Sequence, residues 1–185
     1  MKQEHLALPA VIIVALGLGT WTIQEEEIPA YDRALFRHWT DADGDCQNTR
    51  AEILIAQNMG GTITFRTDED CTVDRGLWVG PYSWQLYTEA ADLDIDHLVS
   101  LKDAWESGAY GWTADEREAY ANDARGLVAV DASLNRQKGA LGLEAWVPPH
   151  PEARCWFARA YVEVKTRWDL TITAAQAEVA EASCP

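Results

Sequence analysis

An uncharged run near the N-terminus limits what this chain can be more than any other feature. Residues 6–23 (LALPAVIIVALGLGTWTI) contain no charged side chain, and the run is long enough for a minimal bilayer span or a signal peptide. Lys2 precedes the run and three glutamates follow it, so the positive-inside rule places the rest of the chain outside the cytoplasm. We predict that residues 1–24 are a signal peptide or an N-terminal membrane anchor, and that residues 25–185 form one exported domain. A buried core helix is the least favoured interpretation, because Pro9 and the glycines of the run disfavour a soluble helix.

The four cysteines fit an exported chain. An even number of cysteines in an oxidising compartment is typical of disulfide bonds, and four cysteines allow three pairings. We favour Cys46–Cys71 and Cys155–Cys184, because each of these bonds closes a local loop within one half of the chain. No C-x-x-C pair is present, which argues against a structural zinc site.

Composition excludes one way of binding nucleic acid. The chain has 185 residues, of which 30 are acidic and 15 basic, giving a formal charge of −15. Such a surface does not attract nucleic acid by bulk electrostatics, although a small basic site within it is compatible with that charge. Two windows, residues 124–139 and 154–168, carry net positive charge, and we expect a nucleic-acid backbone to bind there. For the second window, a solvated helix face is an equal alternative.

Hydrophobic periodicity and capping signals predict an α+β fold with more helix than sheet. Apolar residues at helical spacing predict a helix over Tyr31–Trp39. Further helices are expected over residues 49–57, 114–122, from Asp131 or Ser133 to Lys138, over 152–167, and after the capping box of Thr173 and Gln176. Strands are expected within residues 62–87, with breaks at Gly76 and Gly80–Pro81, and over 93–98 and 127–130. The tryptophans, namely Trp78, Trp84, Trp105, Trp112, Trp146, Trp156 and Trp168, are expected in the core rather than as platforms for nucleobases.

One ordered set of motifs carries chemistry. A strand ends in Asp96 and His97, a second strand reads LVAV, and the helix that follows contains Asn135. An imidazole beside a carboxylate can act as a general base next to a hard cation. Two strands followed by a helix, with these residues, have the layout of a ββα-metal finger, in which Asp96 and Asn135 would converge on one divalent cation beside His97.

The sequence here resembles the HNH, or His-Me finger, endonucleases. It is most similar to a secreted bacterial branch related to the C-terminal nuclease domain of GmrSD-type restriction enzymes. The matching stretches are YDRALFRHWTDADGDCQNTRAEILI, LDIDHLVSLKDAW, EAYAND, LVAV, NRQKG and ARCWFARAYVEVK, and together they span most of the exported chain. The resemblance implies that His97 is the general base and that Asp96 and Asn135 bind the metal. It also agrees with the favoured cysteine pairing.

Two positions depart from the family pattern. Ser100 stands where the family usually has the proline of D-H-x-x-P, and Gly126 stands where an Asn or His usually precedes the second strand. The missing Asn normally braces the loop that carries the base, and Asn122 is a candidate to replace it. Asp94 is expected either to orient His97 or to be simply a carboxylate at the strand end. Arg125, Arg136 and Lys138 are the expected phosphate-binding residues.

Asp41, Asp43 and Asp45 resemble the start of a calcium loop. Glu52 stands at the twelfth position counted from Asp41, but the sixth position, which is glycine in an EF-hand, is Cys46. We therefore expect these carboxylates to cap the following helix or to pair with Arg50.

The sequence thus predicts a metal-dependent, largely non-sequence-specific endonuclease, secreted or tethered outside the membrane, and monomeric. Mg²⁺ is the expected cofactor, with Mn²⁺ or Ca²⁺ as alternatives, because the ligands are few and all oxygens. The substrate is a nucleic acid, with DNA preferred over RNA. The alternative is a non-catalytic secreted domain of the same fold that binds calcium or a protein partner.

Overall fold

A computed structural model describes residues 12–16, 20–24, 27–67 and 69–184, with side chains from residue 27 onward. The chain divides into two compact units, Met1–Ala30 and Tyr31–Pro185. In the first unit, strands β1 (Ile12–Leu16) and β2 (Thr20–Gln24) pair antiparallel, with Ile12 opposite Gln24. The remainder of the segment predicted to be a signal peptide or anchor lies outside the described residues. Within the described part of the chain, no helix has the length and apolar character needed to cross a membrane.

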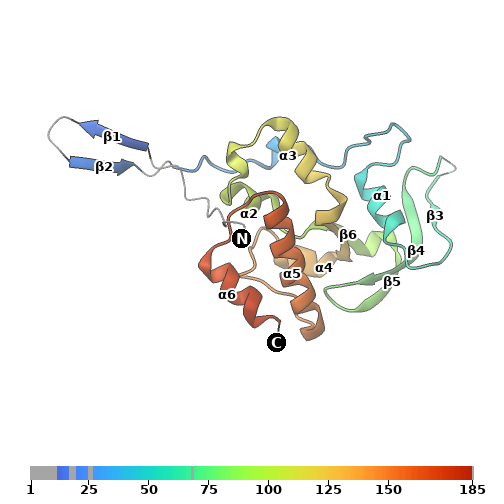
Figure 1. Ribbon diagram of the computed structural model, residues 1–185. Helices are drawn as coiled ribbons and strands as arrows, with labels where there is room; N and C mark the ends of the chain where they lie inside the picture. Colours follow the sequence, from blue (N-terminus) through green and yellow to red (C-terminus); the bar gives the residue numbers. More distant parts are fainter. Residues whose placement is uncertain (1–11, 17–19, 25–26, 68, 185) are drawn as a thin grey trace, which may run out of the picture. The chain divides into compact units, whose positions relative to one another are not determined.

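The second unit is α+β, as predicted. Figure 1 shows its helices: α1 (Thr49–Ala56), α2 (Leu101–Glu106), α3 (Ala114–Ala121), α4 (Ala132–Lys138), α5 (Pro151–Arg167) and α6 (Ala174–Ala182). Strands β3 (Thr64–Phe65), β4 (Val73–Gly80) and β5 (Gln85–Glu89) form an antiparallel sheet in that order. Strands β6 (Leu93–His97) and β7 (Leu127–Asp131) form a separate antiparallel pair.

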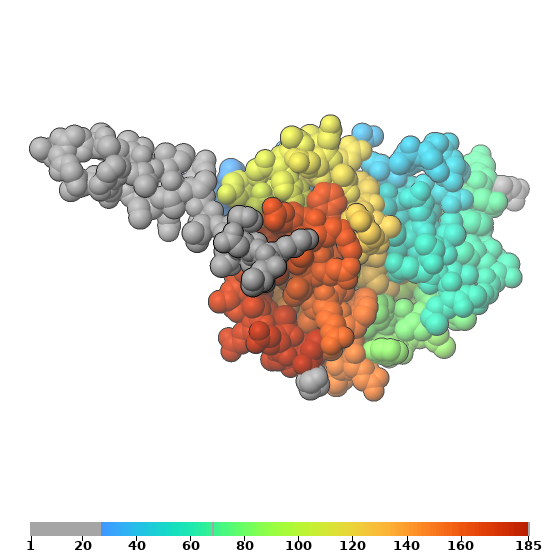
Figure 2. Space-filling model, in the orientation of Figure 1, coloured from blue at the N-terminus to red at the C-terminus, as the bar shows by residue number. Residues whose placement is uncertain are grey.

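The β6–β7 pair lies between two hydrophobic cores. Alternate residues of a strand face opposite sides, so Val128 and Val130 enter the core built with α2, α3 and α5, whereas Leu127 and Ala129 enter the core built with α1 and β4. Figure 1 shows α2, α5 and α6 on one side of the pair and α1 with the three-stranded sheet on the other. In Figure 2 the segments of α3 and α5 lie side by side on one face, where the Tyr120 and Trp168 rings are 5.3 Å apart. This double burial explains why the predicted LVAV strand is apolar on both faces.

The helix ends follow the capping signals. Both predicted capping boxes are present, Thr113 with Glu116 before α3 and Thr173 with Gln176 before α6. Of the two candidates for the cap of α4, Asp131 is the one used, because its side chain accepts a hydrogen bond from the Leu134 amide.

Three local predictions were wrong. The segment Tyr31–Trp39 forms only a short 3₁₀ turn, Arg33–Leu35, because Phe36 is extended and Trp39 has a left-handed backbone with φ 58°. Gly76 does not interrupt β4. It lies where the β4–β5 register shifts, and an added Cβ would approach the Trp78 ring to 2.6 Å.

The third error concerns the tryptophans. Trp78 and Trp105 are buried, as expected for core residues, but Trp84 and Trp156 are 53% and 39% exposed. These two side chains therefore do not serve as core residues.

Both favoured disulfides are present. Cys46–Cys71 ties the loop before α1 to the start of β4, and Cys155–Cys184 ties α5 to the end of α6, with Cα–Cα distances of 5.2 and 4.6 Å. No cysteine is free. The bonds close loops of 25 and 29 residues, and loop-closure entropy suggests that each stabilises the fold by about 3 kcal/mol.

Candidate functional site

The candidate site lies where the open edge of β6 meets α4. The pairing of β6 with β7 sets His97 opposite Leu127 and Asp96 opposite Val128, and α4 follows β7 directly. A hollow of about 340 Å³ at this edge is lined by Asp96, His97 and Asn135. The structure therefore brings these three residues to one place. The other polar side chains that line the hollow are Tyr31, Arg33, Ser100, Lys102 and Arg136.

His97 is held as a neutral imidazole. It is 7% exposed, and its Nε2 lies 2.9 Å from the carbonyl oxygen of Ala121. Because a carbonyl oxygen only accepts hydrogen bonds, Nε2 carries the proton and Nδ1 keeps a lone pair. Burial is the main reason that the pKa of His97 is lowered to about 3; the bond to Ala121 opposes this shift, and the charges of Lys138 and Arg33 add to it.

Asp96 is a buried carboxylate with two donors. Its Oδ2 accepts a hydrogen bond of 2.6 Å from the Tyr82 hydroxyl, and its Oδ1 accepts one of 3.0 Å from Lys138 Nζ. Lys138 Nζ also donates to the His97 carbonyl oxygen at 2.8 Å. Burial raises the pKa of Asp96, and the charge of Lys138 opposes that rise.

Lys138 differs from its predicted place. It was expected at the surface as a phosphate-binding residue, but it is 1% exposed and its ammonium group bonds Asp96 and the backbone. Its position at the last turn of α4 aims the long side chain into the space beneath β6. In this structure Lys138 holds the Asp96 carboxylate and does not face solvent.

Asn135 and Asp94 face each other across the β6–α4 junction. The Asn135 amide nitrogen donates to Asp94 Oδ2 at 3.2 Å, so the Asn135 carbonyl oxygen is left as an acceptor. Arg136 Nε lies 3.9 Å from the same Asp94 oxygen, and the Arg136 side chain is 74% exposed. Asp94 thus positions the α4 side chains. In the described part of the chain, Asp94 forms no hydrogen bond with His97.

These oxygens fit a divalent cation. A carboxylate offers about four acceptor positions, and the donors on Asp96 leave some of them unused. The Asn135 carbonyl oxygen adds a neutral oxygen ligand on the same hollow. Carboxylate and amide oxygens are the ligands that Mg²⁺ and Ca²⁺ prefer. The buried Lys138 charge reduces the negative charge available to such an ion.

Arg125 and Asn122 lie apart from the hollow. Arg125 is exposed and forms a two-pronged ion pair with Asp123, with bonds of 2.7 and 2.9 Å. In the described part of the chain, the Asn122 side chain forms no hydrogen bond with His97. It accepts bonds from the Thr40 amide and the Thr49 hydroxyl and donates to the Arg37 carbonyl, and so it fastens the loop over residues 37–40.

That loop brings residues that the motif analysis missed. The rings of His38 and Trp39 lie 6.5 and 5.7 Å from the His97 ring. Arg33 Nη2 lies 3.3 Å from His38 Nε2, and Arg33 lines the hollow. These residues precede His97 by some sixty positions. The only sequence signal was the YDRALFRHW stretch.

The two departures from the family pattern have local explanations. Ser100 takes the N-cap position of α2, where its hydroxyl accepts a bond from the Asp103 amide and donates to the Ala140 carbonyl. At Gly126, the carbonyl accepts a bond of 3.0 Å from the Leu98 amide, and an added Cβ would meet only the Val164 side chain, at 3.7 Å. The backbone at Gly126 is therefore unstrained. A side chain at this position would also fit without strain.

Among the described residues, the aspartates of the loop before α1 do not make the two contacts expected of them, which were a cap on α1 and an ion pair with Arg50. Asn48, and not an aspartate, caps α1, and Arg50 donates to the carbonyls of Ala90 and Leu93. Asp41, Asp43 and Asp45 are exposed, and their carboxylates come within 4.8 Å of one another. None of the three lines the hollow at His97.

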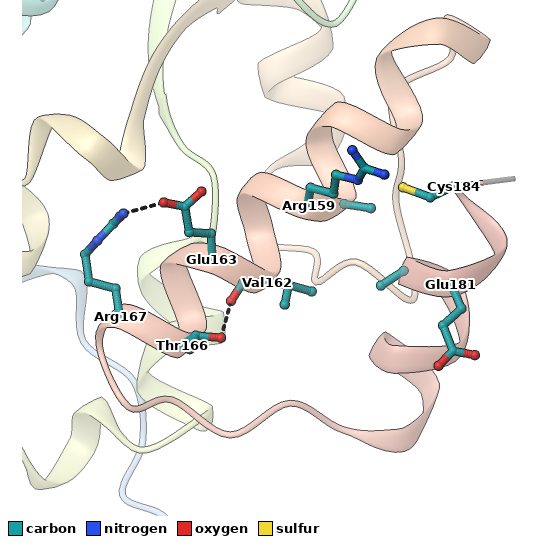
Figure 3. A pocket seen from close by; sticks show the side chains of 9 residues that line it. Arg159, Val162, Glu163, Thr166, Arg167, Glu181 and Cys184 are labelled. Carbon is teal, nitrogen blue, oxygen red and sulfur yellow. Dashed lines mark hydrogen bonds and ion pairs between the residues drawn. The ribbon is translucent and has the colours of Figure 1, made fainter. Parts of the chain in front are cut away.

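A wider hollow of about 760 Å³ lies between α5 and α6 (Figure 3). Arg159, Arg167 and the Cys184 end of a disulfide line it, together with Glu163 and Glu181. Arg167 bonds Glu163 at 2.5 Å, and Lys165 of the same basic window is buried against Asp103. The hollow lacks an imidazole, so its side chains offer no general base of the kind found at His97.

Comparisons with known proteins agree with this architecture. Residues 56–179 match the family model described as GmrSD restriction endonucleases, C-terminal domain. A protein of Arthroderma benhamiae, described as an uncharacterized secreted protein, is 39% identical over 148 residues, which cover 79% of this chain and 70% of that protein. No solved structure matches the chain. The matched region contains both strands of the β6–β7 pair and α4, and the chain belongs to the family of the GmrSD restriction endonuclease C-terminal domain.

Proposed function

We propose that this protein is a metal-dependent endonuclease that hydrolyses phosphodiester bonds of nucleic acid, preferentially DNA and largely without sequence specificity. The observation that carries the proposal is the neutral imidazole of His97, whose Nδ1 lone pair is left free beside Asp96 and Asn135 in a single hollow. Membership of a restriction endonuclease family supports the reaction class.

The basic side chains of the hollow suit a phosphodiester. Arg33, Lys102 and Arg136 line it, whereas its one carboxylate, Asp96, is already paired with Lys138. In a chain of formal charge −15, the lining of this hollow thus has three basic side chains against one acidic side chain. Arg33 and Arg136 lie 103 positions apart in the sequence. They would bind the non-bridging oxygens of one phosphate, because guanidinium groups bond phosphate oxygens in pairs.

In the proposed reaction, His97 Nδ1 takes a proton from a water molecule. The water oxygen bonds to phosphorus in line with the leaving 3′ oxygen, whose bond to phosphorus breaks and which takes a proton from solvent water to become a hydroxyl. The Ala121 carbonyl keeps the imidazole oriented while it becomes an imidazolium. The low pKa of free His97 keeps it unprotonated at neutral pH, and the negative charge of a bound phosphodiester raises that pKa during the reaction. A divalent cation on Asp96 and Asn135, with Mg²⁺ as our proposal, supplies Lewis-acid stabilisation of the developing charge.

We also propose that the domain acts outside the cytoplasm as a monomer. Its two disulfides are typical of oxidising compartments, and the relative from Arthroderma benhamiae is described as secreted. Residues 1–24 would be the signal peptide or membrane anchor.

Nicking of supercoiled plasmid tests the proposal. The parent should nick in Mg²⁺ or Mn²⁺ and stop in EDTA, and His97→Ala should lower the rate about 100- to 10,000-fold. Arg37→Ala is the matched control, because Arg37 is 75% exposed and does not line the hollow. Circular dichroism checks that each variant is folded.

A folded His97→Ala that nicks at the parent rate would contradict the assignment of the base. A parent that nicks in no divalent metal would favour the alternative, a non-catalytic domain. The exposed carboxylates of Asp41, Asp43 and Asp45 would then be the residues to test for calcium binding.

A further inference from the structure

Two exposed tryptophans face a narrow apolar slot on the far side of Tyr82 from the proposed catalytic centre. Trp84 lies in the turn between β4 and β5, and Trp156 lies on α5. Together with Val79, Pro81 and Ala153 they line a hollow of about 140 Å³, which we call the tryptophan slot. Trp84 is 53% exposed and Trp156 is 39% exposed, so both side chains are partly open to solvent.

The backbone of Trp84 has a conformation that is unfavourable for a bulky residue. Its φ is 56°, in the left-handed region that bulky side chains disfavour, and its amide bonds the Gly80 carbonyl at 2.8 Å. A small or polar residue would satisfy the same turn with less strain. Strained residues concentrate at binding sites, so the position is a reason to look for a ligand there.

The surroundings of the slot suit a polyanion better than most of this protein. An adjoining hollow of about 480 Å³ shares Val79, Pro81 and Trp156 with the slot and continues to Arg125. Neither hollow is lined by a carboxylate, although the chain has 30 acidic residues. The charged residue that lines them is Arg125, whose guanidinium is paired with Asp123 at the surface.

The slot and the proposed catalytic centre lie on either side of the Tyr82 side chain. The Tyr82 ring lies 6.4 Å from the Trp156 ring, and its hydroxyl donates to Asp96 at 2.6 Å. A single aromatic side chain thus separates the exposed indoles from the residue proposed to hold the cation.

We propose that the tryptophan slot binds an unpaired nucleobase by stacking, so that the protein prefers single-stranded nucleic acid or strands with exposed bases. The inference rests on the proposed nuclease function, because it names the substrate class of that reaction. Indole faces stack on any base, and substitution of one such platform typically weakens binding about 5- to 150-fold. Bases in a duplex are paired and stacked already, so they cannot enter the slot.

The test measures binding and cleavage separately. Binding of a fluorescein-labelled oligothymidylate to the full chain is followed by anisotropy in EDTA, where no cleavage occurs. Trp84→Ala and Trp156→Ala should each raise the Kd at least fivefold, and Trp84→Phe should restore most of the affinity. Leu86→Ala is the matched control, because Leu86 is 66% exposed on the same hairpin and does not line the slot. A duplex of the same length should lose less than twofold in every variant.

The outcomes separate the slot from the proposed function. If Trp84→Ala binds the oligothymidylate as the parent does, the slot serves another occupant, such as a protein chain or a sugar ring, and the inference is wrong, whether or not the parent cleaves plasmid. If the parent cleaves nothing while both tryptophan variants bind weakly, the slot is supported and the nuclease assignment fails. Trp84 is the decisive position, because it lies in a turn and its substitution removes little packing.

Discussion

At the scale of single residues, the buried imidazole of His97 makes folding depend on pH. A histidine in an unfolded chain has a pKa near 6.5, whereas burial lowers that of His97 to about 3. Between these values the unfolded chain binds a proton that the folded protein does not. The free energy of unfolding should therefore have its full value above about pH 6.5 and should decrease as the pH drops toward about 3.

Urea unfolding at a series of pH values between 7 and 4 measures this effect. His97→Gln lacks the titrating group, so its stability should fall less steeply over the same range. Carboxyl groups that titrate in this pH range contribute equally to the stability of the parent and of His97→Gln. Equal slopes for the parent and the variant would show that His97 is protonated in the folded state.

The ion pair between Lys138 and Asp96 predicts a large loss of stability on one substitution. Both side chains are almost fully buried, and Lys138 Nζ lies 2.9 Å from Asp96 Oδ2. Lys138→Met leaves a buried carboxylate without its cation, which typically costs about 3–5 kcal/mol. Urea unfolding at pH 7 measures the loss.

Lys102→Met is the control for that experiment. Lys102 pairs with Glu106 at 3.4 Å, and both side chains are about half exposed, so the substitution should change stability by less than about 1 kcal/mol. Equal effects of the two substitutions would mean that Asp96 does not need its cation.

At the scale of elements, the loop over residues 37–40 depends on one side chain of α3's C-terminus. Asn122 bonds Thr40, Thr49 and the Arg37 carbonyl, and this loop places His38 and Trp39 against His97. Asn122→Ala should cost about 2 kcal/mol, because several buried or half-buried groups lose their partner. It should also lower the kcat of cleavage, because His97 loses its packing neighbours.

Asn48→Ala separates the two effects of that substitution. Asn48 caps α1 through a bond to the Ala51 amide, and its loss should cost about 1 kcal/mol without moving the loop. We expect Asn48→Ala to keep the parent kcat. If Asn122→Ala also keeps it, the loop does not position His97.

Most elements could be predicted because their signals are local. Capping boxes at Thr113 and Thr173, and the apolar LVAV strand, fixed three of them within a residue or two. The helix α2 was not predicted although Ser100 supplies its cap, because its six residues are too few to show a helical period. The predicted helix over Tyr31–Trp39 does not form, because tertiary contacts bury Phe36. This residue lies off the stripe of apolar residues on which the prediction rested.

The candidate site could be predicted only in part, for a related reason. Asp96, His97 and Asn135 lie in one ββα stretch, and motif order sufficed to bring them together. Tyr82, Arg33 and His38 reach the site from other segments, so their placement follows from packing rather than from spacing. The burial of Lys138 could not be predicted from the sequence either, because a lysine in the last turn of a helix is usually solvated.

At the scale of the whole molecule, the formal charge of −15 opposes the approach of any nucleic acid, whereas the hollow at His97 is locally basic. Repulsion acts over a Debye length of about 10 Å at 0.1 M salt and about 3 Å at 1 M. Added salt therefore removes the long-range repulsion first. The same salt weakens the phosphate contacts, with a slope set by their number.

These opposed effects predict a cleavage rate that rises with NaCl before it falls. Lys138 is buried and Arg125 is paired with Asp123, so Arg33 and Arg136 are the proposed phosphate contacts, and two contacts would give a shallow loss. Plasmid nicking from 0.02 to about 1 M NaCl, at fixed excess Mg²⁺, measures the profile. A small phosphodiester is the control substrate. It carries a single charge and feels little long-range repulsion, so its rate should not rise. A monotonic fall with plasmid from the lowest salt would mean that the local contacts dominate and that the acidic surface does not hinder the substrate.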